Sequence, residues 1–310
     1  MNLRNLWMFF AVLIVIVGIS YLMILRSPDS PDSKMVPHDS RLTEADSGSY
    51  YELRDIQGNI ILQTSFPVSI GDEYIDQDNT HYRISSLKAW DGIVEIVNEK
   101  TDSRKAFLKQ EIKAVQAQAP LGANRRIAIY HTHSDESYLP SAGTESEREG
   151  GGIFRVGYAL SSSLVQAGFV VDQSFALHDP HDINAYYRSR RTLFKLLQDN
   201  PAAAFDVHRD AAPAEAYFTH ITGVESARVM IVVGRQNPNM SANLAFAKQI
   251  KEKADQIYPG LIRGIFMGRG SYNQDLSPRA LLLEIGTQRL SEQLAQNAAH
   301  CFGDVIAAMF

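Results

Sequence analysis

The sequence predicts an α/β fold in which a mostly parallel sheet carries helices on both faces. Three short apolar runs, typical of buried parallel strands, each lead into a histidine or a carboxylate. Stretches with helical spacing alternate with these and other apolar runs, and this alternation favours parallel strands joined by covering helices. The three runs lie at residues 127–130, 203–207 and 280–283.

The N-terminal residues carry a membrane-anchor pattern. Apolar or small residues run from Leu6 to Leu25, and Arg26 follows. At about 1.5 Å per helical residue this run spans about 30 Å, which is the thickness of the hydrocarbon core of a bilayer. It is longer than the core of a cleaved signal peptide. We therefore predict a transmembrane signal-anchor over residues 1–26 and a flexible, proline-, serine- and acid-rich linker over 27–49.

Residues 50–108 are predicted to form a small all-β module. Short β-like runs alternate there with turn sequences such as Asp55-Ile-Gln-Gly58. The module contains a single histidine, His81, and no set of residues that indicates catalysis. A polar connector over residues 109–124 then leads to the predicted α/β domain, residues 125–310.

Helices and strands are predicted in turn along this α/β domain. Val156, Leu160 and Leu164 recur at i, i+4 and i+8, which predicts a helix over residues 153–167 with Gly168 just past its end. The other predicted elements are strands at 169–171 and 229–234, helices at 184–197 and 241–258, a turn-rich loop at 268–278 and a closing helix at 291–309.

Composition excludes some classes of function. The 310 residues carry a net charge of -5 without a basic stripe, so no nucleic-acid partner is expected. Cys301 is the only cysteine, which excludes an intrachain disulfide and a cysteine-based metal site.

Histidines follow two of the apolar runs with the spacing of metal ligands. His131 and His133 stand at i and i+2, so on an extended chain their side chains would share one face. His208 lies between Asp206 and Asp210, either of which would orient its imidazole. Because ligands of open α/β sheets bind beyond the carboxyl ends of the strands, these residues would converge there. The pattern predicts a zinc hydrolase that uses one or both of the paired histidines.

Other residues suggest the remaining parts of such a site. Glu284 follows the buried run Leu281-Leu-Leu283 and suits a general acid/base with a raised pKa, because an amide bond needs a proton for its leaving amine. Arg209 would pair with the neighbouring aspartates or with a substrate carboxylate. Two roles stay open for Tyr272, Asn273 and Asp275, which would line a substrate groove or fix the turn before the last strand.

Four ordered motifs within roughly residues 125–300 closely resemble those of the stage II sporulation protein P family. The motifs are Ile129-Tyr-His-Thr-His-Ser-Asp-Glu-Ser-Tyr138, Asp206-Val-His-Arg-Asp210, Val232-Val-Gly-Arg-Gln-Asn-Pro-Asn239 and Tyr272-Asn-Gln-Asp-Leu-Ser-Pro-Arg-Ala-Leu-Leu-Leu-Glu-Ile-Gly286.

The resemblance implies a function as well as a fold. Members of the family are zinc-dependent N-acetylmuramoyl-L-alanine amidases with an added endopeptidase activity, and they act on peptidoglycan during engulfment of the forespore. The expected protein is therefore a single-pass cell-membrane hydrolase whose catalytic domain is extracytoplasmic and whose partners include other engulfment hydrolases. Two rivals are a metallopeptidase that cuts cross-links and an inactive wall-binding or partner-binding protein; the intact histidines and Glu284 argue against the second.

The resemblance leaves the glutamate ligand open. Glu136 is the carboxylate nearest the paired histidines. In the broader zinc amidases, however, the ligating glutamate comes about a dozen residues after the first histidine, which here would favour Glu145, Glu147 or Glu149. The comparison with the broader zinc amidases also aligns His133 better than His131, whereas the sporulation-type motif offers both histidines.

Overall fold

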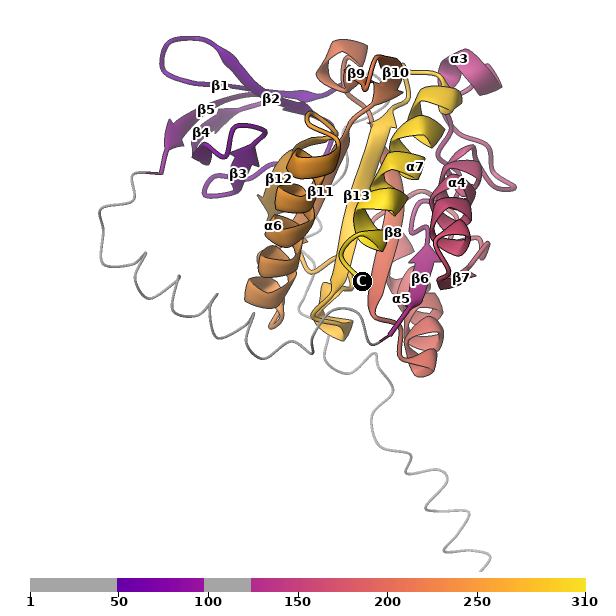
Figure 1. Ribbon diagram of the computed structural model, residues 1–310. Helices are drawn as coiled ribbons and strands as arrows, with labels where there is room; N and C mark the ends of the chain where they lie inside the picture. The colour runs from indigo at the N-terminus through magenta and orange to yellow at the C-terminus, as the bar shows by residue number, and fades with distance from the viewer. Residues whose placement is uncertain (1–48, 98–123) are drawn as a thin grey trace, which may run out of the picture. The chain divides into compact units, whose positions relative to one another are not determined.

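An eleven-stranded sheet runs through both parts of the chain that the computed structural model describes, residues 49–97 and 124–310 (Figure 1). The predicted transmembrane segment, nearly all of the linker and most of the connector lie outside these residues. Within them, no helix combines the length and the apolar character needed to cross a membrane. The strand order across the sheet is β2-β1-β5-β4-β3-β12-β11-β13-β8-β6-β7.

The first five strands continue the main sheet. They are β1 (Tyr51–Arg54), β2 (Ile60–Thr64), β3 (Glu73–Asp76), β4 (His81–Lys88) and β5 (Asp91–Ile96). Each forms where alternation and turns predict a strand. Strand β3 pairs antiparallel with β12 (Ile262–Gly268), with Phe266 opposite Tyr74. The Tyr74 hydroxyl donates to the carbonyl of Arg263 (2.8 Å), and Gly264 lets the ring approach because a Cβ there would clash with it.

The rest of the sheet is mostly parallel. Strand β6 pairs parallel with β7 and β8, β8 with β13, and β11 with β12, whereas β11 and β13 are antiparallel. A separate hairpin joins β9 and β10. The bounds are β6 (Arg126–Tyr130), β7 (Val170–Gln173), β8 (Ala203–Asp210), β9 (Phe218–Ile221), β10 (Val224–Ala227), β11 (Val229–Gly234) and β13 (Ala280–Thr287). The predicted α/β class, with a large sheet and helices, is confirmed.

The helices form where apolar residues recur at helical spacing. In α4, Val156, Leu160 and Leu164 are fully buried on one side. Gly168 then adopts a φ of +86°, which glycine accepts without strain. The helices are α3 (Leu139–Ala142), α4 (Ile153–Gln166), α5 (Ala185–Leu196), α6 (Met240–Ile257) and α7 (Glu292–Ala307), with short 3-10 turns η2 (Leu197–Asp199), η3 (Ala214–Ala216) and η4 (Gln274–Leu276).

Helices cover both faces of the sheet because alternate strand residues point to opposite sides. Ile127 and Ile129 belong to the large core that includes residues of α4, α6 and α7. Ala128 and Tyr130 instead pack with Leu193 of α5. Helices α4, α6 and α7 accordingly lie together on one face in Figure 1, with α5 behind the sheet.

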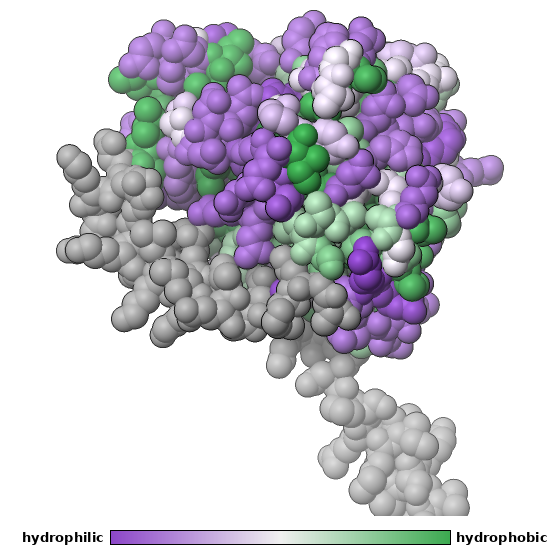
Figure 2. Space-filling model, in the orientation of Figure 1, coloured by the Kyte–Doolittle hydropathy of each residue, from purple (hydrophilic) through white to green (hydrophobic). Residues whose placement is uncertain are grey.

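The surface in the view of Figure 2 is mostly hydrophilic, with hydrophobic side chains among the N-terminal strands. Within residues 49–97, the exposed large hydrophobic side chains include Ile56, Ile60 and Ile96. The histidines and carboxylates that the sequence analysis singled out lie elsewhere, at the carboxyl ends of β6, β8 and β13.

Candidate metal centre

The fold brings His133, Glu136 and His208 together. One ligand atom from each lies within 4.8 Å of the other two, and the exposed fractions of the side chains are 1–3%. His133 and Glu136 follow the end of β6, while His208 lies in β8, the strand paired beside it. The parallel pairing of these strands therefore assembles the group from two distant segments.

The geometry of this group fits zinc. Glu136 Oε1 lies 3.5 Å from His133 Nδ1 and 3.5 Å from His208 Nδ1. A tetrahedral zinc with bonds of about 2.1 Å places its ligand atoms about 3.4 Å apart. Two imidazoles and one carboxylate also leave a fourth position for water or substrate, as in catalytic zinc sites. The second oxygen of Glu136 accepts a hydrogen bond from the backbone nitrogen of Arg209 (2.9 Å), which fixes the carboxylate.

Asp206 orients the His208 ring. Its Oδ1 lies 3.0 Å from His208 Nε2 and accepts a hydrogen bond from the backbone nitrogen of Thr132 (2.8 Å). Its Oδ2 accepts a hydrogen bond from the Thr132 hydroxyl (2.6 Å). A carboxylate on one ring nitrogen leaves the other nitrogen to face a metal. Of the two aspartates that the sequence offered for this purpose, the structure places Asp206 in the role.

Buried charges interact strongly within the group. Burial alone would raise the pKa of the Glu136 carboxyl, but the charge of His208 and hydrogen bonds from His133 and His208 outweigh burial and lower this pKa. Burial would lower the pKa of His208, yet the carboxylates of Asp206 and Glu136 raise it well above its ordinary value. The two carboxylates thus favour a protonated His208 when no metal is bound, and binding of a metal cation to this imidazole would release that proton.

His131 lies outside the group. Strand β6 ends at Tyr130, so the alternation that would place His131 and His133 on one face no longer applies. His131 Nδ1 donates to the carbonyl of Val207 (2.9 Å), and the Gln173 amide donates to its Nε2 (3.2 Å). Burial lowers its pKa to about 4. Its neutral ring is therefore fixed by contacts with residues outside the metal group.

Glu284 lies at the same edge of the sheet. It pairs in register with His208 across the parallel strands β13 and β8, and its exposed fraction is 3%. Paired residues of neighbouring strands lie roughly 5 Å apart, with their side chains on the same face. This position suits the acid/base role predicted for Glu284.

Arg209 pairs with neither neighbouring aspartate. Its Nε donates to the carbonyl of Ser137 (3.0 Å) and its Nη2 to the carbonyl of Glu145 (2.8 Å). The side chain therefore holds the loop that follows Glu136. None of the alternative ligands Glu145, Glu147 and Glu149 belongs to the metal group. Glu147 instead accepts a hydrogen bond from the Ser137 hydroxyl (2.5 Å).

The loop around η4 supports α5. Asp275 forms two hydrogen bonds with Arg190 (2.9 and 2.7 Å), and the Asn273 amide donates to the carbonyl of Tyr186 (3.0 Å). Tyr272 donates to the carbonyl of Arg269 (2.8 Å). These contacts favour the turn-fixing role, and contact with substrate stays a prediction.

The rings of His181 and Tyr186, to which the sequence analysis gave no role in the site, lie beside His133 and His208. His181 stacks on His133 with ring centroids 3.9 Å apart, and its Nδ1 lies 2.9 Å from Asp135 Oδ1. The Tyr186 ring is stacked with His208 at 6.5 Å and meets His133 edge-on at 5.6 Å. The sequence signal that could have identified His181 is a second closely spaced histidine pair, His178 and His181.

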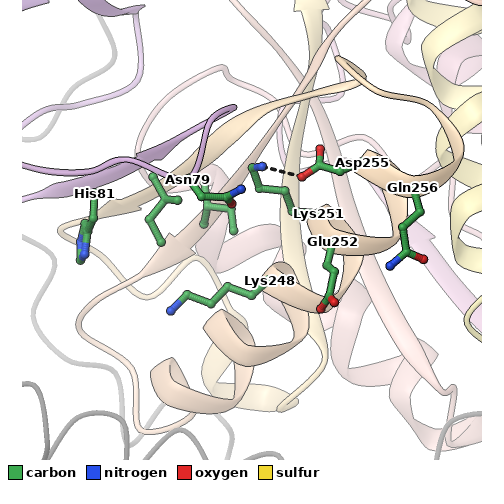
Figure 3. A pocket seen from close by; sticks show the side chains of 9 residues that line it. Asn79, His81, Lys248, Lys251, Glu252, Asp255 and Gln256 are labelled. Atoms are coloured by element: carbon green, nitrogen blue, oxygen red, sulfur yellow. Dashed lines mark hydrogen bonds and ion pairs between the residues drawn. The ribbon is translucent and has the colours of Figure 1, made fainter. Parts of the chain in front are cut away.

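A cavity of about 580 Å³ lies elsewhere, between the β3–β4 strands and α6 (Figure 3). Lys251 bonds Asp255 (2.8 Å) within it, and none of its residues belongs to the metal group. Its volume alone gives no reason to place the chemistry there. The cavity is lined by Ile75, Asn79, His81, Lys248, Lys251, Glu252, Asp255, Gln256 and Ile265.

Comparison with protein families matches residues 71–307 to "Stage II sporulation protein P". The stage II sporulation protein P of Bacillus subtilis (strain 168) is 29% identical over 243 residues, which cover 70% of this chain and 60% of that protein. This chain thus spans about 60% of the length of that relative.

Two solved amidase structures show a partial likeness in fold. N-acetylmuramoyl-L-alanine amidase AmiC2 of Nostoc punctiforme aligns over 60% of this chain and 96% of its own, with a TM-score of 0.37 and 16% identity. The CwlD amidase of Clostridioides difficile, in complex with the GerS lipoprotein, aligns over 59% and 95%, with a TM-score of 0.37 and 12% identity. Such values carry no information about activity.

Proposed function

Because the chain belongs to the stage II sporulation protein P family, we propose that it is a cell-wall hydrolase, a zinc-dependent N-acetylmuramoyl-L-alanine amidase. The group of His133, Glu136 and His208 beside Glu284 is the observation that carries this proposal. The substrate is peptidoglycan, and the cleaved bond joins the muramyl lactyl group to L-alanine. An endopeptidase activity at the same site, on peptide cross-links, belongs to the proposal.

The cellular setting is proposed from the family and the N-terminal sequence. Residues 1–26 anchor the protein in the cell membrane as a single pass, and the catalytic part lies outside the cytoplasm. The protein acts in engulfment of the forespore, together with other hydrolases of that process.

The site residues divide the work of amide hydrolysis. His133, Glu136 and His208 would hold Zn²⁺, which when bound polarises the scissile carbonyl and makes a water nucleophilic near neutral pH. Glu284 accepts the proton of the attacking water and delivers it to the leaving nitrogen of L-alanine, so that a carboxylate and an amine are released. Asp206 keeps His208 oriented throughout, and Arg209 holds the loop after Glu136 in place.

Zinc content and product analysis test the proposal together. The full-length protein is assayed for bound zinc and for release of material from purified sacculi, beside His208→Ala and Glu284→Gln. We expect stoichiometric zinc in the wild type, loss of zinc in His208→Ala, and zinc without activity in Glu284→Gln.

The products identify the bond that is cleaved. A new lactyl carboxylate together with an L-alanine amine indicates the amidase, and cut cross-bridges indicate the endopeptidase. A zinc-free wild type that releases neither product would contradict the proposed enzyme and favour a binding protein.

A further inference from the structure

The first half of the connection between β2 and β3, residues 65–68, is buried, although loops usually lie on the surface. Thr64, Ser65, Phe66 and Val68 are each less than one-tenth exposed. The backbone nitrogen of Phe66 donates to the Thr64 hydroxyl (3.0 Å), which shapes the start of this connection. A buried connection needs partners for its polar groups, and those partners lie at the end of β8.

Ser65 contacts the carboxylate of Asp210. Its backbone nitrogen (2.8 Å) and its hydroxyl (3.0 Å) both donate to Asp210 Oδ1, and the backbone nitrogen of Ala211 lies 3.1 Å from the Ser65 hydroxyl oxygen. On the other side, the Tyr217 hydroxyl donates to Asp210 Oδ2 (2.9 Å), and Arg263 lies 3.8 Å from that oxygen. Hydrogen bonds to a buried carboxylate are stronger than those between neutral groups.

Asp210 lies two residues after His208 in the same strand, so both side chains leave β8 on one face. The hydrogen bonds to Asp210 therefore fix the end of β8, the strand that carries His208. Two of the hydrogen bonds to Asp210 come from Ser65, which directly follows β2, rather than from residues 125–310.

Phe66 makes a second connection to the same site. Its ring meets Tyr272 edge-on at 5.2 Å, and Tyr272 packs against Tyr186 at 5.7 Å. Tyr186 in turn contacts the rings of His133 and His208. An unbroken line of packed aromatic rings thus leads from the β2–β3 connection to both ligand histidines.

We propose that Ser65 and Phe66 are positioning residues of the metal centre, so that the N-terminal strands are part of the catalytic unit rather than a spacer. Ser65 acts through Asp210 on the end of β8, and Phe66 acts through Tyr272 and Tyr186. Neither residue contacts substrate or takes part in the chemistry. The proposal rests on the metal centre of the proposed function.

Zinc affinity of the full-length protein, titrated against a competing chelator, tests this proposal without using activity. Removing a hydrogen-bond partner of a metal ligand weakens metal binding by about 10–100-fold. Because Ser65 acts through Asp210, which does not bond the ligand itself, we expect Ser65→Ala to raise the zinc Kd by several-fold, less than this range. Ser86→Ala removes an exposed hydroxyl from the same group of strands and should leave Kd unchanged.

A second pair of variants separates positioning from stability. Phe66→Leu is expected to raise the zinc Kd and to shift the visible absorption of the Co²⁺-loaded protein, because Tyr272 loses the ring that packs it towards Tyr186, the neighbour of both histidines. Leu62→Ala removes a fully buried side chain of β2. Leu62→Ala should lower Tm at least as much as Phe66→Leu does, but it should change neither the zinc Kd nor the Co²⁺ absorption. In an Asp210→Ala background, which removes the acceptor of both Ser65 hydrogen bonds, Ser65→Ala should add no further loss of affinity.

The outcomes distinguish this proposal from the proposed function. A wild type that binds zinc, with Ser65→Ala and Phe66→Leu indistinguishable from their controls, would overturn the positioning role and leave the metal centre standing. A wild type that binds no zinc would overturn both.

Discussion

Replacing Asp206 by asparagine removes a negative charge while nearly preserving the shape of the side chain. In the wild type, Asp206 Oδ1 lies 3.0 Å from His208 Nε2, and each of the two side chains is 1% exposed. The carboxylate both orients the imidazole and stabilises charge on it. Asp206→Asn should therefore weaken zinc binding without removing a ligand.

The size of the effect follows from the burial of the pair. Removing the carboxylate partner of a ligand histidine costs about 10–100-fold in metal affinity, or about 1.4–2.8 kcal/mol. Water does not reach this pair to replace the lost interaction, and charges act more strongly in a buried site. We therefore expect the upper half of this range, a 30- to 100-fold rise in the zinc Kd.

The assay is a zinc titration against a chelator of known affinity at constant pH. Asp255→Asn serves as the control, because it removes the carboxylate paired with the buried amine of Lys251 (2.8 Å) at the distant cavity. We expect it to lower stability and to leave the zinc Kd unchanged. An Asp206→Asn protein that binds zinc as tightly as the wild type would refute the assignment of His208 as an oriented ligand.

Three further predictions concern other buried groups. His131→Ala should retain one zinc per chain by elemental analysis but lower the free energy of unfolding by roughly 2–4 kcal/mol, because it leaves a cavity; loss of zinc would make His131 a ligand. Burial raises the pKa of Cys301 to about 11, so its thiol should react with iodoacetamide at pH 8 about 100-fold more slowly in the folded than in the unfolded protein; equal rates would contradict this. Burial also raises the pKa of Asp72 to about 6 despite its bond to Arg235, so the native state keeps a proton that the unfolded state loses near pH 4. Stability should then fall by up to roughly 3 kcal/mol as pH rises from 4 to 6, and Asp72→Asn should remove this slope in urea titrations.

The sequence predicts strands and helices well where the periodicity is clean. Strands β6, β8, β11 and β13 and helices α4 to α7 form within a few residues of their predicted limits. Strand β12 was not predicted, because Arg263 and Gly264 interrupt its apolar run. Both interruptions have tertiary reasons: the Arg263 guanidinium lies over the ring of Tyr217 (4.4 Å), and Gly264 makes room for Tyr74. Local patterns carry no information about such partners.

The candidate site was predictable in type but not in detail. Spacing indicated His131 and His133 without choosing between them, and the strand-end pattern indicated His208, while the family resemblance left the glutamate open. Glu136 joins the group because the chain turns after Tyr130, and the same turn separates His133 from His131. The end of a strand is the least predictable feature of a sequence, and here it decides which residues meet. The link between Ser65 and Asp210 spans 145 residues, and no local pattern reveals it.

X-ray absorption spectroscopy at the zinc edge of the loaded, full-length protein tests the central claim most directly. A centre built from His133, Glu136 and His208 predicts four nitrogen or oxygen neighbours at about 2.0–2.1 Å, with the scattering signature of two imidazoles. His131→Ala should leave this spectrum unchanged, and His133→Ala should lose one imidazole. Three imidazoles in the wild type, or a spectrum altered by His131→Ala and not by His133→Ala, would contradict the metal centre described above.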